Sequence, residues 1–335
     1  MFNNLKSILY FLKNQKRFKR IFFFENYFIE DHLSPYVYKY FDNNKTLLLA
    51  TYDFKNKELY KFNVIKIGNN FFLNFLFQFL RIKYCYSSTP ELGKSYFVKS
   101  AFKITKYIFI QHSPMGLNGI YKKDAFNNFD VVQVINKFQK NDLIEINLFN
   151  KKNIKIWKSK YLFFHNKNNP IKKKNEKIKV LIAPSHGTLF YQKAIDLLVK
   201  SLDQNLYHVE FRPHLMTIQK NRFLLKKIKD NFIINSGKIN FSEFDILISD
   251  WSGAYIEFAH QKKQKSILID VPQKILNDNF KQFSNKSIDI EARKILGKVI
   301  KINQINKINY FINEVNKEKI INEKIVSNFF REYFF

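Results

Sequence analysis

Short runs of apolar residues recur along the first half of the chain, and polar residues stop each of them. The runs are rich in β-branched and aromatic residues, as β-strands are, and lie at 20–24, 45–51, 62–67, 82–87 and 106–112. Segments of helix length separate several of them, as at 35–43 and 70–81. Strands that alternate with helices predict a parallel sheet covered by helices.

A polar, lysine-rich segment at 166–177 interrupts this pattern and predicts an interdomain linker. Beyond it, strands are predicted at 179–184, 207–211, 232–235, 246–248 and 267–272, and helices at 191–203, 218–229 and from residue 254. The length of 335 residues fits two domains. We therefore expect an α/β protein of two Rossmann-like domains, 1–168 and 178–335, facing a cleft, with a helical segment at the C-terminus.

The segment 245–253 ends one predicted strand and opens the next predicted helix. Ser249, Ser252 and Gly253 place hydroxyl groups and free backbone N–H groups at the start of that helix, where the helix dipole attracts anions. This arrangement predicts a phosphate-binding site. It has neither the spaced glycines of the dinucleotide fingerprint nor the Gly-Lys-Ser/Thr of a Walker loop. Because a carboxylate repels phosphate, Asp250 is expected to cap the helix or to hold neighbouring groups in place.

Three more polar clusters follow predicted strands, at the sheet edge where ligands bind in open α/β folds. His112 titrates near neutrality and could accept a proton from an attacking hydroxyl. Arg212 could clamp a phosphate, and His214 could stabilise or protonate a departing phosphate oxygen. Ser185 and His186, with Thr188 beside them, are supporting candidates. For each histidine the alternative is a structural loop residue.

Glu257 lies on the helix that follows Ser252 and is a candidate to accept hydrogen bonds from a ribose diol; the alternative is a solvated surface carboxylate. No His, Asp and Glu grouping has metal-ligand spacing, so neither a metal nor another cofactor is expected. No Ser-His-Asp order or nucleophile elbow occurs either. Four further histidines form no constellation and are interpreted as structural or exposed: His32, His165, His208 and His260.

The formal charge of +29 suggests an anionic partner but does not favour nucleic acid. Only 7 of the 57 basic residues are Arg, and nucleic-acid readers depend on Arg for bidentate contacts. A single cysteine, Cys85, excludes a disulfide framework and favours a reducing compartment. Without a run long enough to span a bilayer or a signal-peptide core, a cytoplasmic location is expected.

Taken together, these segments resemble the CDP-glycerol glycerophosphotransferase family of teichoic-acid and capsule synthesis. The resemblance covers roughly residues 20 to 300 in the right order and rests on combined motifs rather than on any one of them. The matching pieces are Ser-Thr-Pro-Glu-Leu at 88–92, His-Ser-Pro at 112–114, Ile-Tyr at 120–121, Ala-Phe at 125–126, Phe-Asp at 129–130, Ala-Pro-Ser at 183–185, Arg-Pro-His-Leu-Met-Thr at 212–217, the segment 245–253, Glu-Phe-Ala at 257–259 and Ile-Asp-Val-Pro at 269–272.

The resemblance implies a GT-B fold and metal-independent transfer of glycerol phosphate, or a related polyol phosphate, from a CDP-polyol. The first domain would take the acceptor, a glycan or lipid-linked polyol phosphate, and the second would bind the nucleotide. The family's histidines correspond to His112 and His214, its arginine to Arg212, and its phosphate-binding hydroxyls to Ser249 and Ser252. His186 stands where relatives often have an aromatic residue.

Two other functions stay open at this stage. One is a GT-B glycosyltransferase with a nucleotide-sugar donor, and the other is a basic protein that binds lipid surfaces or nucleic acid without catalysis. Separately, the lysines and aromatic residues of 11–24 and the aromatic tail 329–335 suggest an anionic membrane surface as a further partner, on the inner face of the cell membrane. Ordinary core packing is the alternative for these aromatic residues.

Overall fold

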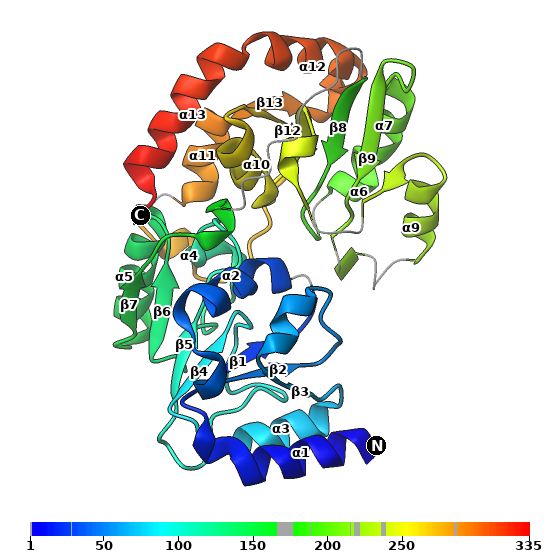
Figure 1. The fold of residues 1–335 in the computed structure, drawn as a ribbon. Helices are drawn as coiled ribbons and strands as arrows, with labels where there is room; N and C mark the ends of the chain where they lie inside the picture. Colours follow the sequence, from blue (N-terminus) through cyan, green and yellow to red (C-terminus); the bar gives the residue numbers. More distant parts are fainter. Residues whose placement is uncertain are drawn as a thin grey trace.

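A computed structural model describes residues 2–27, 29–165, 177–187, 189–214, 216–217, 222–235, 239–284 and 287–335. Two parallel β-sheets dominate this part of the chain, one in each half (Figure 1). The first has seven strands in the order β3-β2-β1-β4-β5-β6-β7 and the second has six in the order β10-β9-β8-β11-β12-β13. Both orders place the first strand of each half inside its sheet, third from one edge, as in Rossmann-like domains.

The strands of the first sheet are β1 (Arg20–Phe24), β2 (Thr46–Ala50), β3 (Asn63–Lys66), β4 (Tyr84–Ser87), β5 (Lys106–Phe109), β6 (Val131–Val134) and β7 (Lys155–Lys158). Those of the second are β8 (Ile178–Ile182), β9 (Tyr207–Phe211), β10 (Ile233–Ile234), β11 (Ile246–Ser249), β12 (Ser266–Asp270) and β13 (Gly297–Lys301). All neighbouring strands in each sheet pair in parallel.

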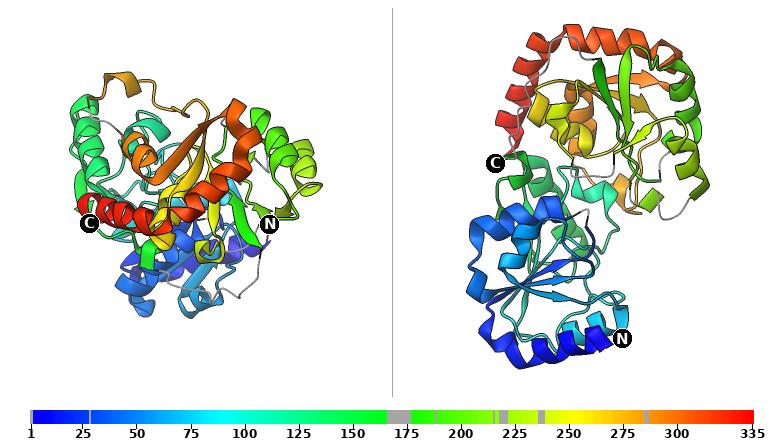
Figure 2. Two further views of the ribbon diagram at one scale, coloured as in Figure 1. Left: turned by 90° about the horizontal axis from the view of Figure 1, so that it is seen from above. Right: turned by 45° about the vertical axis from the view of Figure 1, so that its right-hand side comes forward.

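Helices flank both sheets, as the two further views show (Figure 2). In the first half they are α1 (Phe2–Asn14), α2 (Glu30–Tyr40), α3 (Asn70–Gln78), α4 (Leu117–Ile120) and α5 (Lys137–Asn150), followed by the 3-10 helix η4 (Leu162–His165). In the second half they are α6 (Phe190–Lys193), α7 (Ile195–Ser201), α9 (Arg222–Lys229), α10 (Ala254–Lys262), α11 (Ile288–Leu296), α12 (Ile308–Lys317) and α13 (Lys319–Tyr333).

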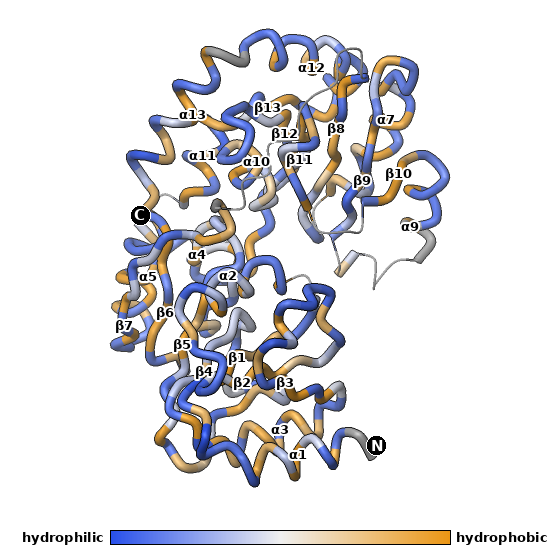
Figure 3. Tube along the Cα trace, in the orientation of Figure 1, coloured by the Kyte–Doolittle hydropathy of each residue, from blue (hydrophilic) through white to orange (hydrophobic). Residues whose placement is uncertain are grey.

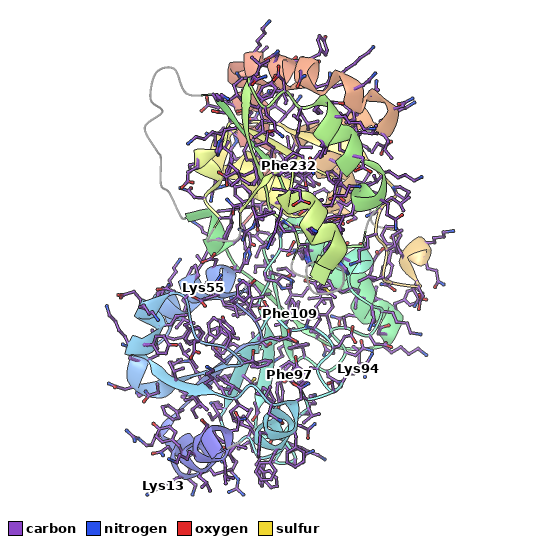
Figure 4. The ribbon with its side chains drawn as sticks, turned by 90° about the vertical axis from the view of Figure 1, so that its right-hand side faces the viewer. Lys13, Lys55, Lys94, Phe97, Phe109 and Phe232 are labelled. Carbon is purple, nitrogen blue, oxygen red and sulfur yellow. The ribbon has the colours of Figure 1, made fainter. Side chains whose placement is uncertain are left out.

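Alternate residues of each central strand enter opposite layers of the core. Ile21 and Phe23 of β1 pack on one face of the first sheet, whereas Phe22 and Phe24 pack on the other. Successive strand residues point to opposite faces, and helices cover both faces, so the strand is apolar throughout. The apolar strands stand out inside each half (Figure 3), and Phe97 and Phe109 lie inside the first domain (Figure 4).

A third core layer joins the two halves. It combines Met115 and Phe163 from the first half with Leu181, Leu247 and Tyr255 from the second. The C-terminal helix α13 returns from the second domain to the first, where the ring of Tyr333 lies 5.1 Å from that of Phe138. The backbone N–H of Phe335 donates to the Ile135 carbonyl at 3.2 Å. These contacts fix the two sheets relative to each other.

The predicted class, α/β with two Rossmann-like domains and a C-terminal helical segment, is confirmed. Strands β1 and β9 occupy the predicted residues, and α10 begins at the predicted Ala254. The predicted helix at 191–203 is broken at Ala194 into α6 and α7. The linker predicted at 166–177 lies outside the described residues except for Lys177. Several elements were not predicted: α1, β6, α5, β7, α11 and β13.

The aromatic residues considered for membrane contact lie largely in the core. Phe11, Phe18 and the aromatic residues of β1 are buried, as are Phe329 and Phe330 of α13. Core packing therefore accounts for these side chains. None of the helices in the described ranges combines the length and apolar character that crossing a bilayer requires.

Candidate functional site

Hydrogen bonds tie together the carboxyl ends of β8 and β11. The Asp250 carboxylate accepts from the backbone N–H of Ser185 at 2.7 Å and from its hydroxyl at 3.1 Å. The Ser249 hydroxyl, which is buried, donates to the Ala183 carbonyl at 2.7 Å. Asp250 thus holds neighbouring groups, as its sequence context suggested. Ser249 is used in the same way, and its hydroxyl bridges the two strand ends.

Arg293 of α11 fixes the loop that leads into α10. Its guanidinium donates to the carbonyls of Asp250 and Ile269, both at 2.9 Å, and lies 4.4 Å from the centre of the Trp251 ring. Sequence reasoning did not single out Arg293. By binding these two carbonyls, Arg293 connects the carboxyl ends of β11 and β12. These hydrogen bonds restrict the position of the loop from which α10 starts.

The start of α10 lies against the first domain. Gly253 precedes the helix, and the Ser252 hydroxyl accepts from the backbone N–H of Ala254 at 3.3 Å. A Cβ atom added to Gly253 would lie 2.7 Å from the Ser113 hydroxyl and 3.2 Å from Cδ of Pro114. The loop after β5, which carries His112, therefore approaches the positive end of the α10 dipole closely.

Arg212 and His214 leave the carboxyl end of β9. Nη1 of Arg212 donates to Oδ1 of Asn235 at 2.9 Å, so a neighbouring strand end orients the guanidinium. The backbone N–H of His214 donates to the Tyr191 hydroxyl at 3.1 Å. The Nδ1 atom of His214 accepts from the backbone N–H of Met216 at 3.3 Å. Since Nδ1 accepts, the neutral ring carries its proton on Nε2, which makes Nε2 a hydrogen-bond donor.

His186 lies beside His214, with ring centres 5.6 Å apart and planes inclined by 27°. Its Nδ1 atom is 3.2 Å from the hydroxyl of Thr217. Although His214 is exposed, desolvation lowers its pKa to about 4, together with the charges of His186, Lys274 and His112. Thr188, considered with His186, lies outside the described residues. Lys274 follows β12 and was missed, although it stands beyond a strand end like the other candidates.

His112 supplies the imidazole of the first domain. The side chain is half-buried, and its Nδ1 atom is buried without a hydrogen-bond partner among the described residues. Desolvation lowers the pKa of His112 to about 4, and a backbone interaction with Ser88 partly opposes this. His112 is therefore neutral at pH 7 and able to accept a proton.

Charges from one domain shift the pKa values of histidines in the other, which shows which predicted residues the fold brings to the domain junction. The charge of His112 lowers the pKa of His214, although the two residues belong to different domains. His112 and Arg212 both lower the pKa of His32, which desolvation brings to about 3. The imidazoles of His32 and His112 in the first domain are thus within electrostatic range of Arg212 or His214 of the second domain. His32, interpreted as structural or exposed from sequence, belongs to this cluster, and nothing in its local sequence indicates it.

Glu257 is neither a solvated surface carboxylate nor open to a ligand on all sides. It is 6% exposed and accepts from the Tyr161 hydroxyl at 2.7 Å. Desolvation raises the pKa of Glu257 to about 8, while the Tyr161 hydrogen bond and the charge of Arg212 lower it. In the described ranges, no three His, Cys, Asp or Glu side chains gather so that they could hold a metal ion.

Two parallel Rossmann-like domains, joined by a C-terminal helix that crosses back to the first, define the GT-B fold. The sequence matches no family model, and no curated protein resembles it significantly. Two solved structures of the wall teichoic acid polymerase TagF with CDPG are similar to this chain, with TM-scores of 0.59 and 0.60 at 14% identity, covering 99% of this chain and 92% of the other.

Two further solved structures share the fold. Staphylococcus aureus MnaA with UDP has a TM-score of 0.56 at 10% identity, covering 92% of this chain and 89% of the other. UDP-GlcNAc 2-epimerase from Neisseria meningitidis, bound to UDP-GlcNAc, has a TM-score of 0.51 at 10% identity, covering 92% and 93%. At these identities the comparisons establish the GT-B fold of this chain.

Proposed function

We propose that this protein is a transferase that moves a polyol phosphate, such as glycerol phosphate, from a CDP-activated donor to a hydroxyl group of a glycan or polyol-phosphate acceptor, releasing CMP. The observation that supports this proposal most is the electrostatic cluster at the domain junction, where the charge of His112 in one domain lowers the pKa of His214 in the other. A neutral imidazole within electrostatic range of a second imidazole, with a guanidinium at the same domain junction, suits phosphoryl transfer, where positioning and charge stabilisation supply most of the catalysis.

The donor diphosphate would lie at the start of α10 and against Arg212. There it would meet the Ser252 hydroxyl and the positive end of the α10 dipole. In this proposal Ser249 and Asp250 support the site from behind, because their side chains already bind the end of β8. The similarity in fold to TagF, whose structures contain CDPG, supports a donor of this chemical class.

The acceptor hydroxyl would enter from the first domain. His112 takes its proton, the acceptor oxygen forms a bond to the β-phosphorus, and the bond to the bridging oxygen breaks so that CMP leaves. Nε2 of His214 donates a hydrogen bond to the phosphoryl oxygens as charge develops there. The low pKa of His112 keeps the ring neutral before reaction, and the approaching diphosphate raises that pKa because an anion favours the imidazolium.

The test is CMP release from CDP-glycerol, CDP-ribitol and a panel of nucleotide sugars by wild type, His112→Asn and His208→Asn. His208 is the matched control because it is a histidine of β9 that pairs with Glu210 at 3.2 Å, away from the cluster. CMP formed by wild type and His208→Asn but not by His112→Asn would support the proposal. Wild-type turnover that survives in His112→Asn would overturn the role of His112.

The runner-up is a GT-B glycosyltransferase with a nucleotide-sugar donor. The same start of α10 and Arg212 would hold its diphosphate, and the solved structures of MnaA and of the epimerase contain UDP or UDP-GlcNAc. In that case attack falls on a sugar carbon and the product is a nucleoside diphosphate. The identity of the released nucleotide therefore separates the two functions.

We also propose that α1 contacts an anionic membrane surface, to which a lipid-linked acceptor would be attached. Leu5, Leu9 and Leu12 are exposed on this helix although they are apolar, and Lys6 and Lys13 are on the same helix. Leucines exposed beside lysines on one helix suit an anionic lipid surface, where apolar side chains enter the interface and lysines meet the headgroups. Co-sedimentation with phosphatidylglycerol vesicles at low salt is expected for wild type and lost in Leu5→Ser/Leu9→Ser; equal sedimentation of both would contradict the proposal.

A further inference from the structure

A chain of hydrogen bonds crosses the domain junction next to the proposed site. It starts at His32 on α2, passes through Tyr161 just before η4, and ends at Glu257 on α10 of the second domain. The His32 Nδ1 atom is 2.8 Å from the Tyr161 hydroxyl oxygen, which is 2.7 Å from Oε1 of Glu257. Figure 1 shows α2 on the side of the first domain that faces the second.

The hydrogen-bond chain is packed in the protein interior at Tyr161, and its His32 end is accessible. Tyr161 is 2% exposed, and the His32 ring stacks on Phe163 with centres 4.5 Å apart. The His32 side chain is 18% exposed. Among the described residues, Nδ1 of His32 has the Tyr161 hydroxyl as its partner, whereas Nε2 has no partner and is not fully buried. Nε2 is thus the nitrogen that a substrate could reach.

A proton on Oε1 of Glu257, the oxygen that meets the Tyr161 hydroxyl, sets the direction of both hydrogen bonds between Glu257, Tyr161 and His32. When Glu257 is ionised, Tyr161 donates to it, His32 donates from Nδ1 to Tyr161, and Nε2 of the neutral ring is an acceptor. When Glu257 is protonated on Oε1, it donates to Tyr161, Tyr161 donates to Nδ1, and Nε2 carries the proton as a donor. Neutral imidazole has one proton for its two nitrogens, so the state of Oε1 fixes which nitrogen of His32 carries that proton.

The surrounding charges place this reversal in an accessible pH range. Burial raises the pKa of Glu257 to about 8, against the charge of Arg212 and the hydrogen bond from Tyr161. His32, with a pKa of about 3 under the influence of His112 and Arg212, stays neutral throughout. Tyr161 is faced by Tyr36 and Tyr121 as well as by Glu257, and its pKa is raised well above its usual value, mainly by burial.

We propose that His32 is a further substrate-contacting residue of this site, and that Glu257, acting through Tyr161, decides whether Nε2 of His32 donates or accepts a hydrogen bond. The proposal rests on the proposed function for the group contacted: a phosphoryl oxygen next to His112. Below the titration of Glu257, Nε2 donates to that oxygen; above it, Nε2 presents a lone pair and repels the oxygen. Glu257 is then a positioning residue and not a ribose ligand.

The direct test is nitrogen-15 NMR of the histidine rings in the free protein between pH 6 and pH 10, with His32→Asn assigning the signals. In wild type, the His32 proton is expected on Nε2 below about pH 8 and on Nδ1 above it. In Glu257→Gln, which cannot ionise, the tautomer is expected to stay constant. A wild-type tautomer that does not change, or a change that persists in Glu257→Gln, would overturn the inference.

Turnover gives the second readout. CMP release by wild type is expected to fall about fivefold between pH 8 and pH 9, because with a pKa of about 8 the protonated fraction of Glu257 falls by that factor. Glu257→Gln is expected to lack this fall. The control is Tyr36→Phe. The Tyr36 hydroxyl also makes two hydrogen bonds to the 160–162 segment, but it is not part of the hydrogen-bond chain from His32 to Glu257. The Tyr36→Phe variant should therefore keep the wild-type pH profile of turnover.

The two readouts separate the two hypotheses. If no donor is turned over but the His32 tautomer reverses as expected, the proposed function fails and the hydrogen-bond switch stands. If CMP is released but the tautomer is constant, the switch is wrong and the transferase stands. If Glu257→Gln loses the tautomer change but keeps the fall in turnover between pH 8 and pH 9, then His32 does not contact the substrate.

Discussion

Two buried carboxylates, one from each domain, bind consecutive backbone N–H groups of the loop that follows His112. Asp289 of α11 accepts from Gly116 at 2.7 Å, and Asp142 of α5 accepts from Leu117 at 2.8 Å. The second oxygen of each carboxylate is buried and lacks a hydrogen-bond partner among the described residues. Ionising both acids therefore places two negative charges in a buried site, and we predict that Asp142→Asn stabilises the protein at alkaline pH.

The size of the effect follows from the pKa values. Desolvation raises the pKa of Asp142 from 3.8 to about 8, and the charge of Asp289 adds to this. Folded Asp142 thus keeps a proton that the unfolded chain releases, so the free energy of unfolding falls as pH rises. The slope is about 1.4 kcal/mol per pH unit, or on the order of 4 kcal/mol between pH 5 and pH 8. Asp142→Asn removes this contribution while keeping an oxygen for Leu117.

Urea denaturation of wild type and Asp142→Asn at pH 5, 6, 7 and 8 measures the difference directly. The variant is expected to gain stability relative to wild type steadily up to pH 8. For Asp289, whose pKa desolvation raises only to about 6, the gain in Asp289→Asn should level off near pH 6. The double variant should gain less than the sum because each charge acts on the other. A difference that is independent of pH would refute the reasoning.

Three further predictions test the junction. Gly253→Ala should lower kcat about a hundredfold, because the added Cβ displaces the Ser113 hydroxyl and with it the loop that carries His112. The double variant Gly253→Ala/Ser113→Gly should recover kcat. A double variant that stays as slow as Gly253→Ala would contradict this packing argument. Arg212→Lys should weaken CDP binding about tenfold by calorimetry, since the fork to Asn235 and phosphate is lost. Phe329→Ala should cost about 3–5 kcal/mol in urea denaturation, because the side chain is 2% exposed in the core that joins the domains.

The central strands could be predicted because both of their faces are buried, which makes them continuous apolar runs bounded by polar residues. β1 and β2 are of this kind. The edge strands β7 and β13 escaped prediction for the opposite reason: lysines flank their few apolar residues, and their outer positions are exposed. β6 is short, and α5 contains buried polar residues that conceal its apolar face.

The candidate site was predictable to the extent that it follows strand ends. His112, Arg212 and His214 each stand directly beyond a strand or one or two residues further on, so their neighbourhood follows from sheet topology. His32 and Glu257 could not be joined from sequence. Their link runs through Tyr161, which is 129 residues from His32 and 96 from Glu257. Only the packing of the two domains brings these three side chains into one series of hydrogen bonds.

The central claim is that both domains contribute groups to phosphoryl transfer from a CDP-polyol at their junction. The most direct test is to identify the nucleotide that purified protein releases from CDP-glycerol with a polyol-phosphate acceptor, and to repeat the measurement with His112→Asn and His214→Asn. We predict CMP from wild type and a large loss of CMP in both variants, one for each domain. Release of a nucleoside diphosphate from a nucleotide sugar instead, or CMP release that is unaffected by either substitution, would contradict the account.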